Sequence, residues 1–337
     1  SVTDFGAVGD GVTDDGPAIN LALDYIRSLL DDSVTTKLNG LKIEFPPGDY
    51  LIQTTLNFTG IKSAGFVADF SGAFLIGQTN GKPVIDLMGS RYWHFMNLYI
   101  HGDDTLTPNF GVIHGRMTDT VSAGDAQFTN CNIIGEYTVA SLYNLASETT
   151  SYFSCKFWNE HQAGATKCVY MDGDNTFDIS SDYTNVTIPV GTKQSFNENG
   201  FYTCDIRNTN IVGTPSCIYI SGKSSRHGFI QCYAANFGGP IVETYNIPDC
   251  VDWNLDIHVE VDLGGGNGVT EFLLVDNVTP GVSINLAGLK IRDQNAQCTT
   301  SLIDTTGSTY ALLLDGINIE LSDTTNAIPI YGGTLVP

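Results

Sequence analysis

The chain has 337 residues, of which 42% are hydrophobic, and a mean hydropathy of +0.00, so it is long enough to bury a sizeable core. Its 37 acidic residues outnumber its 15 basic ones, and the formal net charge of −22 repels nucleic acids and anionic membranes. We therefore expect no nucleic-acid partner, and no membrane insertion either, because no run approaches the roughly 18 apolar residues of a membrane helix. No basic and then apolar leader precedes Ser1, which predicts a chain that is either not secreted or already trimmed.

The chain opens with "SVTDFGAVGDGVTDDGPAINLAL", a glycine- and aspartate-rich stretch that leads into a predicted amphipathic helix over residues 13–30. Thr13 or Asp14 is suited to the N-cap and Pro17 to the first turn. Apolar residues recur at helical spacing at Ile19, Leu23, Ile26 and Leu30. The segment "GAVGDG" follows no strand and contains neither GKS/T nor GxGxxG, so we expect no nucleotide and no other cofactor.

A short pattern, F-x-x-(C/L)-x-I, recurs eight times after the helix. The copies are "FMNLYI" (95–100), "FTNCNI" (128–133), "YFSCKF" (152–157), "FYTCDI" (201–206), "FIQCYA" (229–234), "DWNLDI" (252–257), "LAGLKI" (286–291) and "LDGINI" (314–319). Each copy is followed by a second short apolar strand, such as "GVIHG" or "KCVYM". Repeats of about 23 to 34 residues with strand-like alternation predict a β-solenoid.

We therefore predict an all-β chain, a single-stranded right-handed parallel β-helix with an N-terminal capping α-helix. Residues 1–40 would form the first turn and the helix that covers the first rung, and residues 41–337 one continuous solenoid domain. A β-sandwich is the alternative, but it gives no reason for one column to repeat eight times. That column comprises Leu98, Cys131, Cys155, Cys204, Cys232, Leu255, Leu289 and Ile317.

The chain has eight cysteines and no CxxC pair. Four of them alternate with leucine and isoleucine in the repeated column, so we expect small buried side chains with free thiols rather than disulfides. Cys155 and Cys204 are 49 residues apart, as are Cys168 and Cys217, so the insertion over about 172–198 lies outside both strands and is expected to project as a loop or hairpin. Neither "DGDN" (172–175) nor "GDD" (102–104) has the ligand count of a calcium loop, and we expect no metal.

The stretch "VTDFGAVGDGVTDD", followed by a helix and by "LKIEFPPGDYLI" at 41–52, resembles the N-terminal signature of the pectate-lyase-like superfamily, particularly its phage tailspike and capsule (exopolysaccharide) depolymerase branch. The resemblance implies a right-handed parallel β-helix, frequently a homotrimer, that binds and usually cleaves a bacterial surface polysaccharide. It also implies an extracellular or virion-associated location on a phage tail. Hydrolases, lyases, epimerases and non-catalytic binders share this start.

Aligned by the repeated column, the third residue beyond each first strand is Asp103, Glu136, Glu160, Thr209, Phe237, Glu260 and Gln294. Three consecutive turns thus present a carboxylate at one equivalent place. With turns about 4.8 Å apart, Glu136 and Glu160 would lie about 5 Å apart and Asp103 and Glu160 about 10 Å apart, separations that resemble retaining and inverting glycosidases. Stacked carboxylates also raise the pKa of one member. The alternative is that acidic residues simply decorate the turns of an acidic protein.

Four residues around this column are candidate substrate contacts: Trp158, His161, Tyr137 and Arg207. An indole stacks on the apolar face of a sugar, and a guanidinium binds a carboxylate or hydroxyl, although packing at a subunit contact would use the same residues. A second stripe, His114, Tyr143, Tyr170 and Tyr219, is expected to face outward and to serve a trimer contact or glycan binding.

The leading hypothesis is a depolymerase that hydrolyses glycosidic bonds with Glu136, Glu160 and Asp103. A lyase is the runner-up, because it needs a cation beside the uronate carboxylate and a base for the C5 proton. The densest basic group, Lys223, Arg226 and His227 in "GKSSRHG", with Arg207 one turn earlier, would supply them unless it is a solvated loop. A non-catalytic glycan-binding spike is the third hypothesis.

Overall fold

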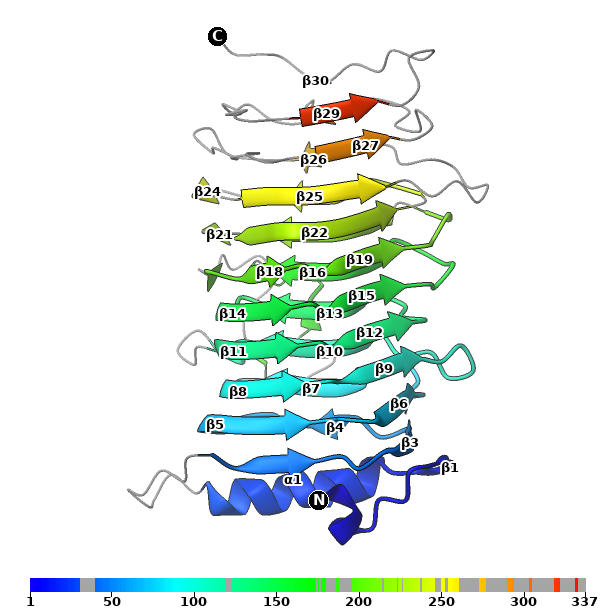
Figure 1. Cartoon of the computed structure of the whole chain (residues 1–337), viewed down its shortest axis with the longest axis vertical. Helices are drawn as coiled ribbons and strands as arrows, with labels where there is room; N and C mark the ends of the chain where they lie inside the picture. Colours follow the sequence, from blue (N-terminus) through cyan, green and yellow to red (C-terminus); the bar gives the residue numbers. More distant parts are fainter. Residues whose placement is uncertain are drawn as a thin grey trace.

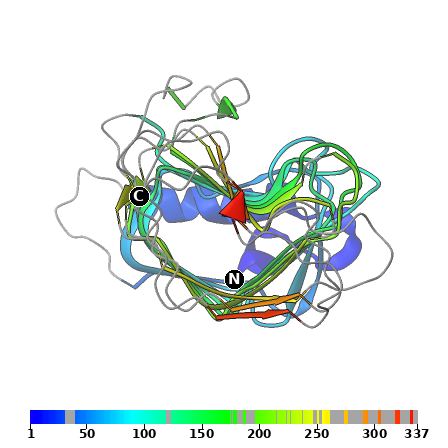
Figure 2. The same cartoon turned by 90° about the horizontal axis from the view of Figure 1, so that it is seen from above.

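The computed structural model describes residues 1–30, 40–118, 123–173, 175, 177–179, 186–187, 196–213, 215–222, 224–225, 227–236, 238–245, 250–251, 254–260, 273–276, 290–293, 303–304, 318–321 and 331–332. Over these residues the chain forms parallel strands stacked in successive turns (Figure 1). Seen along the stacking axis, strands of successive turns lie over one another (Figure 2). The predicted fold class, an all-β parallel β-helix that begins with a helix, is confirmed.

Each turn contributes strands to a long, bent sheet and to a second sheet that faces it. The first arm of the long sheet contains β2 (Lys42–Glu44), β5 (Lys62–Asp69), β8 (Arg91–Met96), β11 (Gly124–Thr129), β14 (Glu148–Phe153) and β18 (Gly200–Tyr202). The second arm contains β1 (Asp10–Asp14), β3 (Gly48–Ile52), β6 (Ala73–Gly77), β9 (Tyr99–Gly102), β12 (Asn132–Gly135), β15 (Lys156–Asn159) and β19 (Asp205–Asn208). The arms are continuous in β22 (Gly228–Asn236), which β25 (Asn254–Glu260), β27 (Lys290–Asp293) and β29 (Asn318–Leu321) follow.

The facing sheet contains β4 (Leu56–Asn57), β7 (Ile85–Met88), β10 (Phe110–Gly115), β13 (Ala140–Leu145), β16 (Lys167–Asp172), β20 (Ser216–Ser221), β23 (Val242–Tyr245), β26 (Leu273–Asp276), β28 (Ile303–Asp304) and β30 (Tyr331–Gly332). Three short strands, β17 (Phe196–Asn197), β21 (Ser224–Ser225) and β24 (Cys250–Val251), form a small third sheet. No helix within the described ranges is long and apolar enough to cross a membrane.

The interior is built from columns of equivalent residues. Rings stack from turn to turn, with centroids 5.7 Å apart for Phe95 and Phe128, 5.0 Å for Phe128 and Tyr152, and 4.3 Å for Tyr152 and Phe201. The neighbouring column holds Cys131, Cys155, Cys204 and Cys232, which are buried with free thiols as predicted. Burial raises the pKa of the Cys155 thiol well above its ordinary value, so this column acts as small apolar side chains.

The predicted repeated column is wrong at one residue, Leu255. The pairing of β22 with β25 places Leu255 beside Phe229 and Ile257 beside Cys232, with a one-residue irregularity between these two pairs. Ile257, two residues after Leu255, therefore takes the column position of the sixth copy. Leu289 and Ile317 lie outside the described residues.

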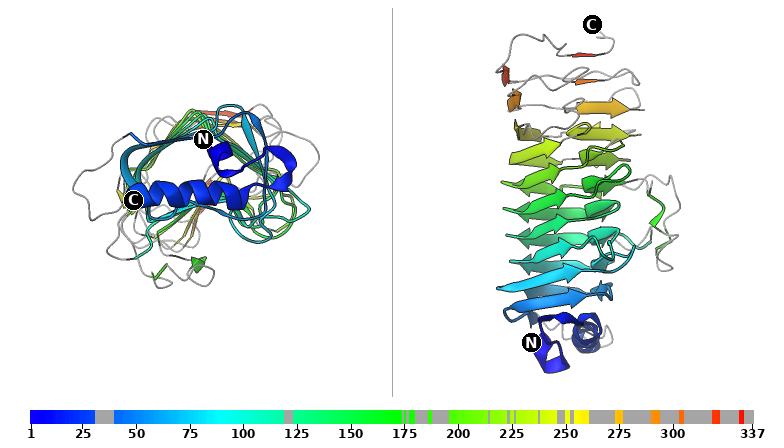
Figure 3. Two further views of the ribbon diagram at one scale, coloured as in Figure 1. Left: turned by 90° about the horizontal axis from the view of Figure 1, so that it is seen from below. Right: turned by 90° about the vertical axis from the view of Figure 1, so that its right-hand side faces the viewer.

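Helix α1 (Gly16–Leu29) lies across the N-terminal end of the stack, after the short helix η1 (Val2–Phe5) (Figure 3). Its apolar stripe, Ile19, Leu23 and Ile26, is buried against the first rungs. The N-cap is Asp15 rather than Thr13 or Asp14, and it makes no side-chain cap bond. Its carboxylate instead accepts hydrogen bonds from the backbone N–H groups of Val8 (2.6 Å) and Gly9 (3.1 Å), which fixes the glycine-rich entry to the helix.

The insertion covers the outer face of the second sheet. Phe177, Ile179 and Val186 pack with Tyr143, Tyr170 and Tyr219 in an apolar cluster outside the solenoid core. The Asp172 carboxylate anchors this segment, since it accepts hydrogen bonds from the Tyr143 hydroxyl (2.9 Å), the Phe177 N–H (3.1 Å) and the Ser221 hydroxyl (2.9 Å). The three tyrosines of the stripe point outward as predicted, but residues of the insertion bury them within this chain.

His114 does not belong to that stripe at all. Ile113, not His114, pairs with Tyr143, and the imidazole turns into the solenoid, where its Nε2 lies 2.5 Å from the Tyr152 hydroxyl. Burial lowers the pKa of His114 to about 3, so it is neutral at physiological pH.

Asp86 on β7 generates a prediction about stability. Its side chain is 8% exposed, and burial raises its pKa from 3.8 to about 6, against hydrogen bonds from the Met88 N–H and the Thr59 hydroxyl that lower it. The native state therefore binds a proton more tightly than the unfolded state, and this group makes the protein less stable as pH rises from about 4 to 6. The change in the free energy of unfolding that Asp86→Asn causes should be about 2 kcal/mol more stabilising at pH 7.5 than at pH 4.5.

Urea unfolding of the wild type and the variant at both pH values measures this difference. Asp69→Asn is the matched control, because a hydrogen bond from the Ser71 hydroxyl lowers the pKa of Asp69, and its removal should cost stability at neutral pH. A gain for Asp86→Asn that is the same at both pH values would contradict the assignment.

Candidate active site

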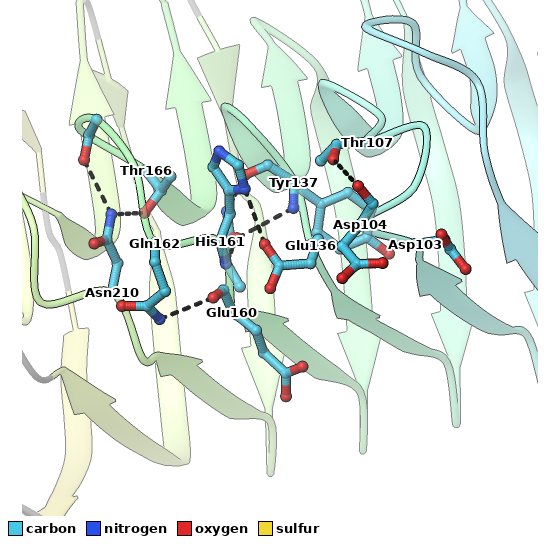
Figure 4. A network of polar contacts seen from close by, with 12 residues as sticks. Asp103, Asp104, Thr107, Glu136, Tyr137, Glu160, His161, Gln162, Thr166 and Asn210 are labelled. Atoms are coloured by element: carbon cyan, nitrogen blue, oxygen red, sulfur yellow. Dashed lines mark hydrogen bonds and ion pairs between the residues drawn. The ribbon is translucent and has the colours of Figure 1, made fainter.

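The three candidate carboxylates lie on successive turns. Their backbone N–H groups donate to the turn below at 2.9 Å each: Asp103 to the Gly77 carbonyl, Glu136 to Gly102 and Glu160 to Gly135. Thr209 continues the column with a 3.0 Å bond to the Asn159 carbonyl. The structure therefore places Asp103, Glu136 and Glu160 one above another where β9, β12 and β15 end (Figure 4).

The side chains of the two glutamates differ in their partners. Glu136 Oε2 lies 2.9 Å from His161 Nδ1, and both side chains are about a quarter exposed (25% and 23%). The Glu160 carboxylate points away from this pair (Figure 4) and makes no hydrogen bond or ion pair to another described residue. One glutamate is thus held by an imidazole that can carry a proton, and the other is open to solvent.

Burial and hydrogen bonds act in opposite directions on the pKa of Asp103. Burial alone would raise it, but hydrogen bonds from the backbone and side chain of Thr105 and from Gln78, together with the charge of His101, bring the pKa below its ordinary value. The Thr105 N–H donates to Asp103 Oδ1 at 2.7 Å. Asp103 is therefore ionised at neutral pH, which suits a base or nucleophile rather than an acid.

A ladder of buried asparagines fixes the turns that carry the column. Asn159 donates from Nδ2 to the carbonyls of Tyr137 (3.0 Å) and Lys167 (2.9 Å), and its Oδ1 accepts from the N–H groups of Tyr137 (3.3 Å) and His161 (3.1 Å). Asn208 and Asn236 occupy the equivalent position on the next two turns. Sequence reasoning missed this ladder, although the signal was present as an Asn at the end of three consecutive copies.

Tyr137 is not a substrate contact. It is fully buried, its hydroxyl donates to the Ile134 carbonyl at 2.8 Å, and its ring occupies the space that the missing side chain of Gly102 leaves. A Cβ on Gly102 would lie 2.8 Å from that ring. Tyr137 instead supports the turn that carries Glu136.

Trp158 and Arg207 form a stack on the outer face of β15 and β19. The guanidinium of Arg207 lies 4.7 Å from the centre of the Trp158 ring and 4.8 Å from that of Tyr233. Two bonds to the Asp205 carboxylate (2.8 and 3.0 Å) hold it there and offset its charge. This part of the surface therefore offers an indole and a planar cation whose charge Asp205 offsets. The exposed Lys156 adds a second cation, with its Nζ 5.3 Å from the centre of the Trp158 ring.

The basic cluster of the lyase hypothesis is only partly described. His227 is 1% exposed, and burial lowers its pKa to about 3, so the prediction of an accessible cation at this position is wrong. Lys223 and Arg226 lie outside the described residues. No group of three or more His, Cys, Asp or Glu side chains in the described part of the chain is placed to hold a metal ion.

The asparagine ladder predicts a local effect on the turn that holds Glu160. Asn159→Ala removes four buried hydrogen bonds, and we expect it to lower the free energy of unfolding by about 2–4 kcal/mol. Asn208→Ala is the matched control, because its side chain bonds the next turn in the same way. Both variants should be destabilised, but only Asn159→Ala should speed amide hydrogen exchange at Tyr137 and His161. Equal exchange in both variants would show that Asn159 does not hold this turn.

Comparison with known proteins agrees with the fold. Residues 1–229 match a family model described as "Rhamnogalacturonase A/epimerase, pectate lyase-like". The mannuronan C5-epimerase AlgE6 of Azotobacter vinelandii is 29% identical over 132 residues, which is 38% of this chain and 14% of that protein.

One solved viral protein shares the architecture at low identity. ORF18 of Geobacillus virus E2 is 16% identical with a TM-score of 0.59, over 98% of this chain and 58% of that one. The tailspike gp49 of Acinetobacter baumannii bacteriophage Fri1, a capsular polysaccharide depolymerase, is 10% identical with a TM-score of 0.49, over 97% and 63%. The resemblance in the N-terminal stretch is confirmed by the match over residues 1–229, and the chain belongs to the rhamnogalacturonase A/epimerase, pectate-lyase-like family.

Proposed function

We propose that this protein is a polysaccharide depolymerase that hydrolyses glycosidic bonds of a bacterial capsular or exopolysaccharide. The observation that carries the proposal is the stack of Asp103, Glu136 and Glu160 on consecutive turns, beside the aromatic and cationic surface of Trp158 and Arg207. Membership of the pectate-lyase-like family supports a polysaccharide substrate. A homotrimer and an extracellular or virion-associated location belong to the same proposal.

The carboxylates take different roles in this mechanism. Asp103, with its lowered pKa, is the base or nucleophile. A glutamate donates a proton to the leaving glycosidic oxygen. If that acid is Glu136, one turn of about 4.8 Å separates the pair, and Asp103 attacks the anomeric carbon to form a glycosyl–enzyme bond. Glu136, now a carboxylate, then takes a proton from the water that breaks this bond, with net retention of configuration. If it is Glu160, two turns separate the pair, and Asp103 takes a proton from a water that attacks with inversion.

His161 supports Glu136 in the proton transfer. Its Nδ1 lies 2.9 Å from Oε2, and this contact orients the Glu136 carboxyl group, which regains its proton from the attacking water.

Uronate chemistry, by β-elimination or C5 epimerisation, is the second candidate. The 29% identity to a mannuronan C5-epimerase over 132 residues favours it. Such a reaction needs a base at C5 and a cation beside the uronate carboxylate. Among the described residues near the three carboxylates, Glu136 with His161 would provide the base. His161 or the exposed Lys156 would provide the cation, because Arg207 is bonded to Asp205 and His227 is buried.

Incubation with a panel of bacterial capsular and exopolysaccharides tests both reactions. We expect new reducing ends without ultraviolet absorbance from unsaturated uronate. Asp103→Asn should slow the release, and so should whichever of Glu136→Gln and Glu160→Gln removes the acid, each by about 10²–10⁴-fold. Asp104→Asn is the matched control, since Asp104 is in the same turn but outside the column.

The outcomes separate the hypotheses. Ultraviolet absorbance that rises together with the reducing ends would indicate that the glycan is cleaved by β-elimination and not by hydrolysis. Cleavage at the wild-type rate in all three variants would refute the carboxylate assignment. Binding without cleavage across the panel would favour a glycan-binding spike, provided that nuclear magnetic resonance shows no inversion at C5 of the uronates, which would indicate an epimerase. For an active protein, the anomeric configuration of the first product decides between Glu136 and Glu160 as the acid.

A further inference from the structure

The carboxylates stand at one end of a continuous outward surface. In a strand, alternate side chains share a face, so Tyr99, His101 and then Asp103 point outward while Ile100 is buried in the core. The next turn repeats this pattern as Asn132, Ile134 and Glu136. The surface therefore runs along the strands, across the solenoid axis, from the start of β9 and β12 to the carboxylates.

A hollow of about 500 Å³ opens at the other end of these strands. Gly72 and Ala73 line it where the chain bends before β6. The rings of Phe74 and Tyr99 form one wall, with centroids 4.7 Å apart and planes 30° apart. The aromatic column ends there, because the residue that pairs with Tyr99 on the following turn is Asn132.

Amides line the rest of the hollow. Asn97 and Asn130 occupy the bend with φ of 57° and 53°, a left-handed conformation that asparagine tolerates better than most residues. Asn130 Nδ2 donates to Asn97 Oδ1 at 3.0 Å, and Asn97 Nδ2 donates to the Ser71 hydroxyl at 3.0 Å. These bonds hold the two carboxamides in a row. Asn130 is exposed, and no donor among the described residues bonds its Oδ1, so this oxygen can accept a hydrogen bond from a ligand.

The lining is uncharged, which is notable in a chain with a net charge of −22. Aromatic rings and oriented amides, with no cation, suit a neutral sugar: the rings cover its apolar face and the amides bond its hydroxyl groups. A uronate would bring a carboxylate with no cation in the lining to offset it.

We propose that this hollow binds an uncharged sugar unit of the glycan, which then lies along β9 and β12 toward Asp103 and Glu136. This inference rests on the proposed function, because it takes the bound unit to be part of the same polysaccharide. Tyr99 and Asp103 are four residues apart on one extended strand, or about 13 Å. The hollow is therefore a subsite separate from the bond that is cleaved, and the glycan crosses the solenoid rather than following its axis.

Isothermal titration of the full chain with neutral hexose oligosaccharides tests the subsite without requiring cleavage. Uronate-containing oligosaccharides of the same length serve as the charged comparison. We expect binding of a neutral oligosaccharide, weakened about tenfold by Tyr99→Ala, since aromatic contacts contribute about 0.5–1.5 kcal/mol beyond buried area and 1.4 kcal/mol is a factor of ten. Tyr99→Phe keeps the ring and should retain the affinity. Asn130→Gly, at an exposed residue whose left-handed backbone conformation glycine also adopts, should weaken binding without a folding defect.

Tyr202→Ala is the matched control. Tyr202 stacks on Phe153 at 4.8 Å on the first arm of the sheet, so the variant removes an equivalent ring away from the hollow, and its affinity should be unchanged. Failure of every neutral oligosaccharide to bind, equal affinity in Tyr99→Ala and the wild type, or tighter Tyr99-dependent binding of the uronates would each overturn the proposal.

The proposed function and the subsite are refuted by different results. It fails if cleavage is absent or independent of Asp103, Glu136 and Glu160, whatever the titrations show. If cleavage depends on these carboxylates while Tyr99→Ala binds normally, the hydrolase stands and the subsite does not.

Discussion

The in-register stacking of parallel strands is the constraint on which this structure depends. Each turn lies about 4.8 Å above the last, so every residue meets its own equivalent on both sides. In the core this aligns rings, as in Phe128, Tyr152 and Phe201. At the surface the same register brings like charges together, as in Asp103, Glu136 and Glu160. Core packing and the spacing of the candidate site are therefore set by one geometric rule.

Much of the architecture could be predicted because the rule leaves a trace in the sequence. A column that repeats eight times identifies the solenoid, and it aligned the carboxylates on consecutive turns without any knowledge of side-chain contacts. The predicted direction of the side chains was wrong where the alternation of inward and outward residues is ambiguous. In "GVIHG", Ile113 and His114 could each face inward or outward. The predicted alternation assigned the His114 imidazole to the outer face, although it lies in the core. The sixth copy was also misplaced, because neither the register of β25 against β22 nor the irregularity between them leaves a mark on composition.

Other features depend on contacts between distant segments, which no local pattern encodes. The outward tyrosines Tyr143, Tyr170 and Tyr219 carry the alternation of an exposed face, yet residues of the insertion cover them. Arg207 has the appearance of a free cation until Asp205, two positions earlier, binds it through both oxygens. Tyr137 lies next to Glu136 in sequence but belongs to the interior, because the glycine at 102 leaves room for its ring.

The asparagine ladder has a consequence for how such a site evolves. Asn159 and Asn208 hold their turns through backbone carbonyls and N–H groups, so the residue that follows each of them contributes little to the folding of the turn. The chain illustrates this directly, because Glu160 follows one asparagine and Thr209 follows the other on equivalent backbones. Selection can exchange the chemical group at this position in a single step while the scaffold stays the same. A lineage built on this turn can thus gain, lose or alter a reaction without first having to evolve a new fold.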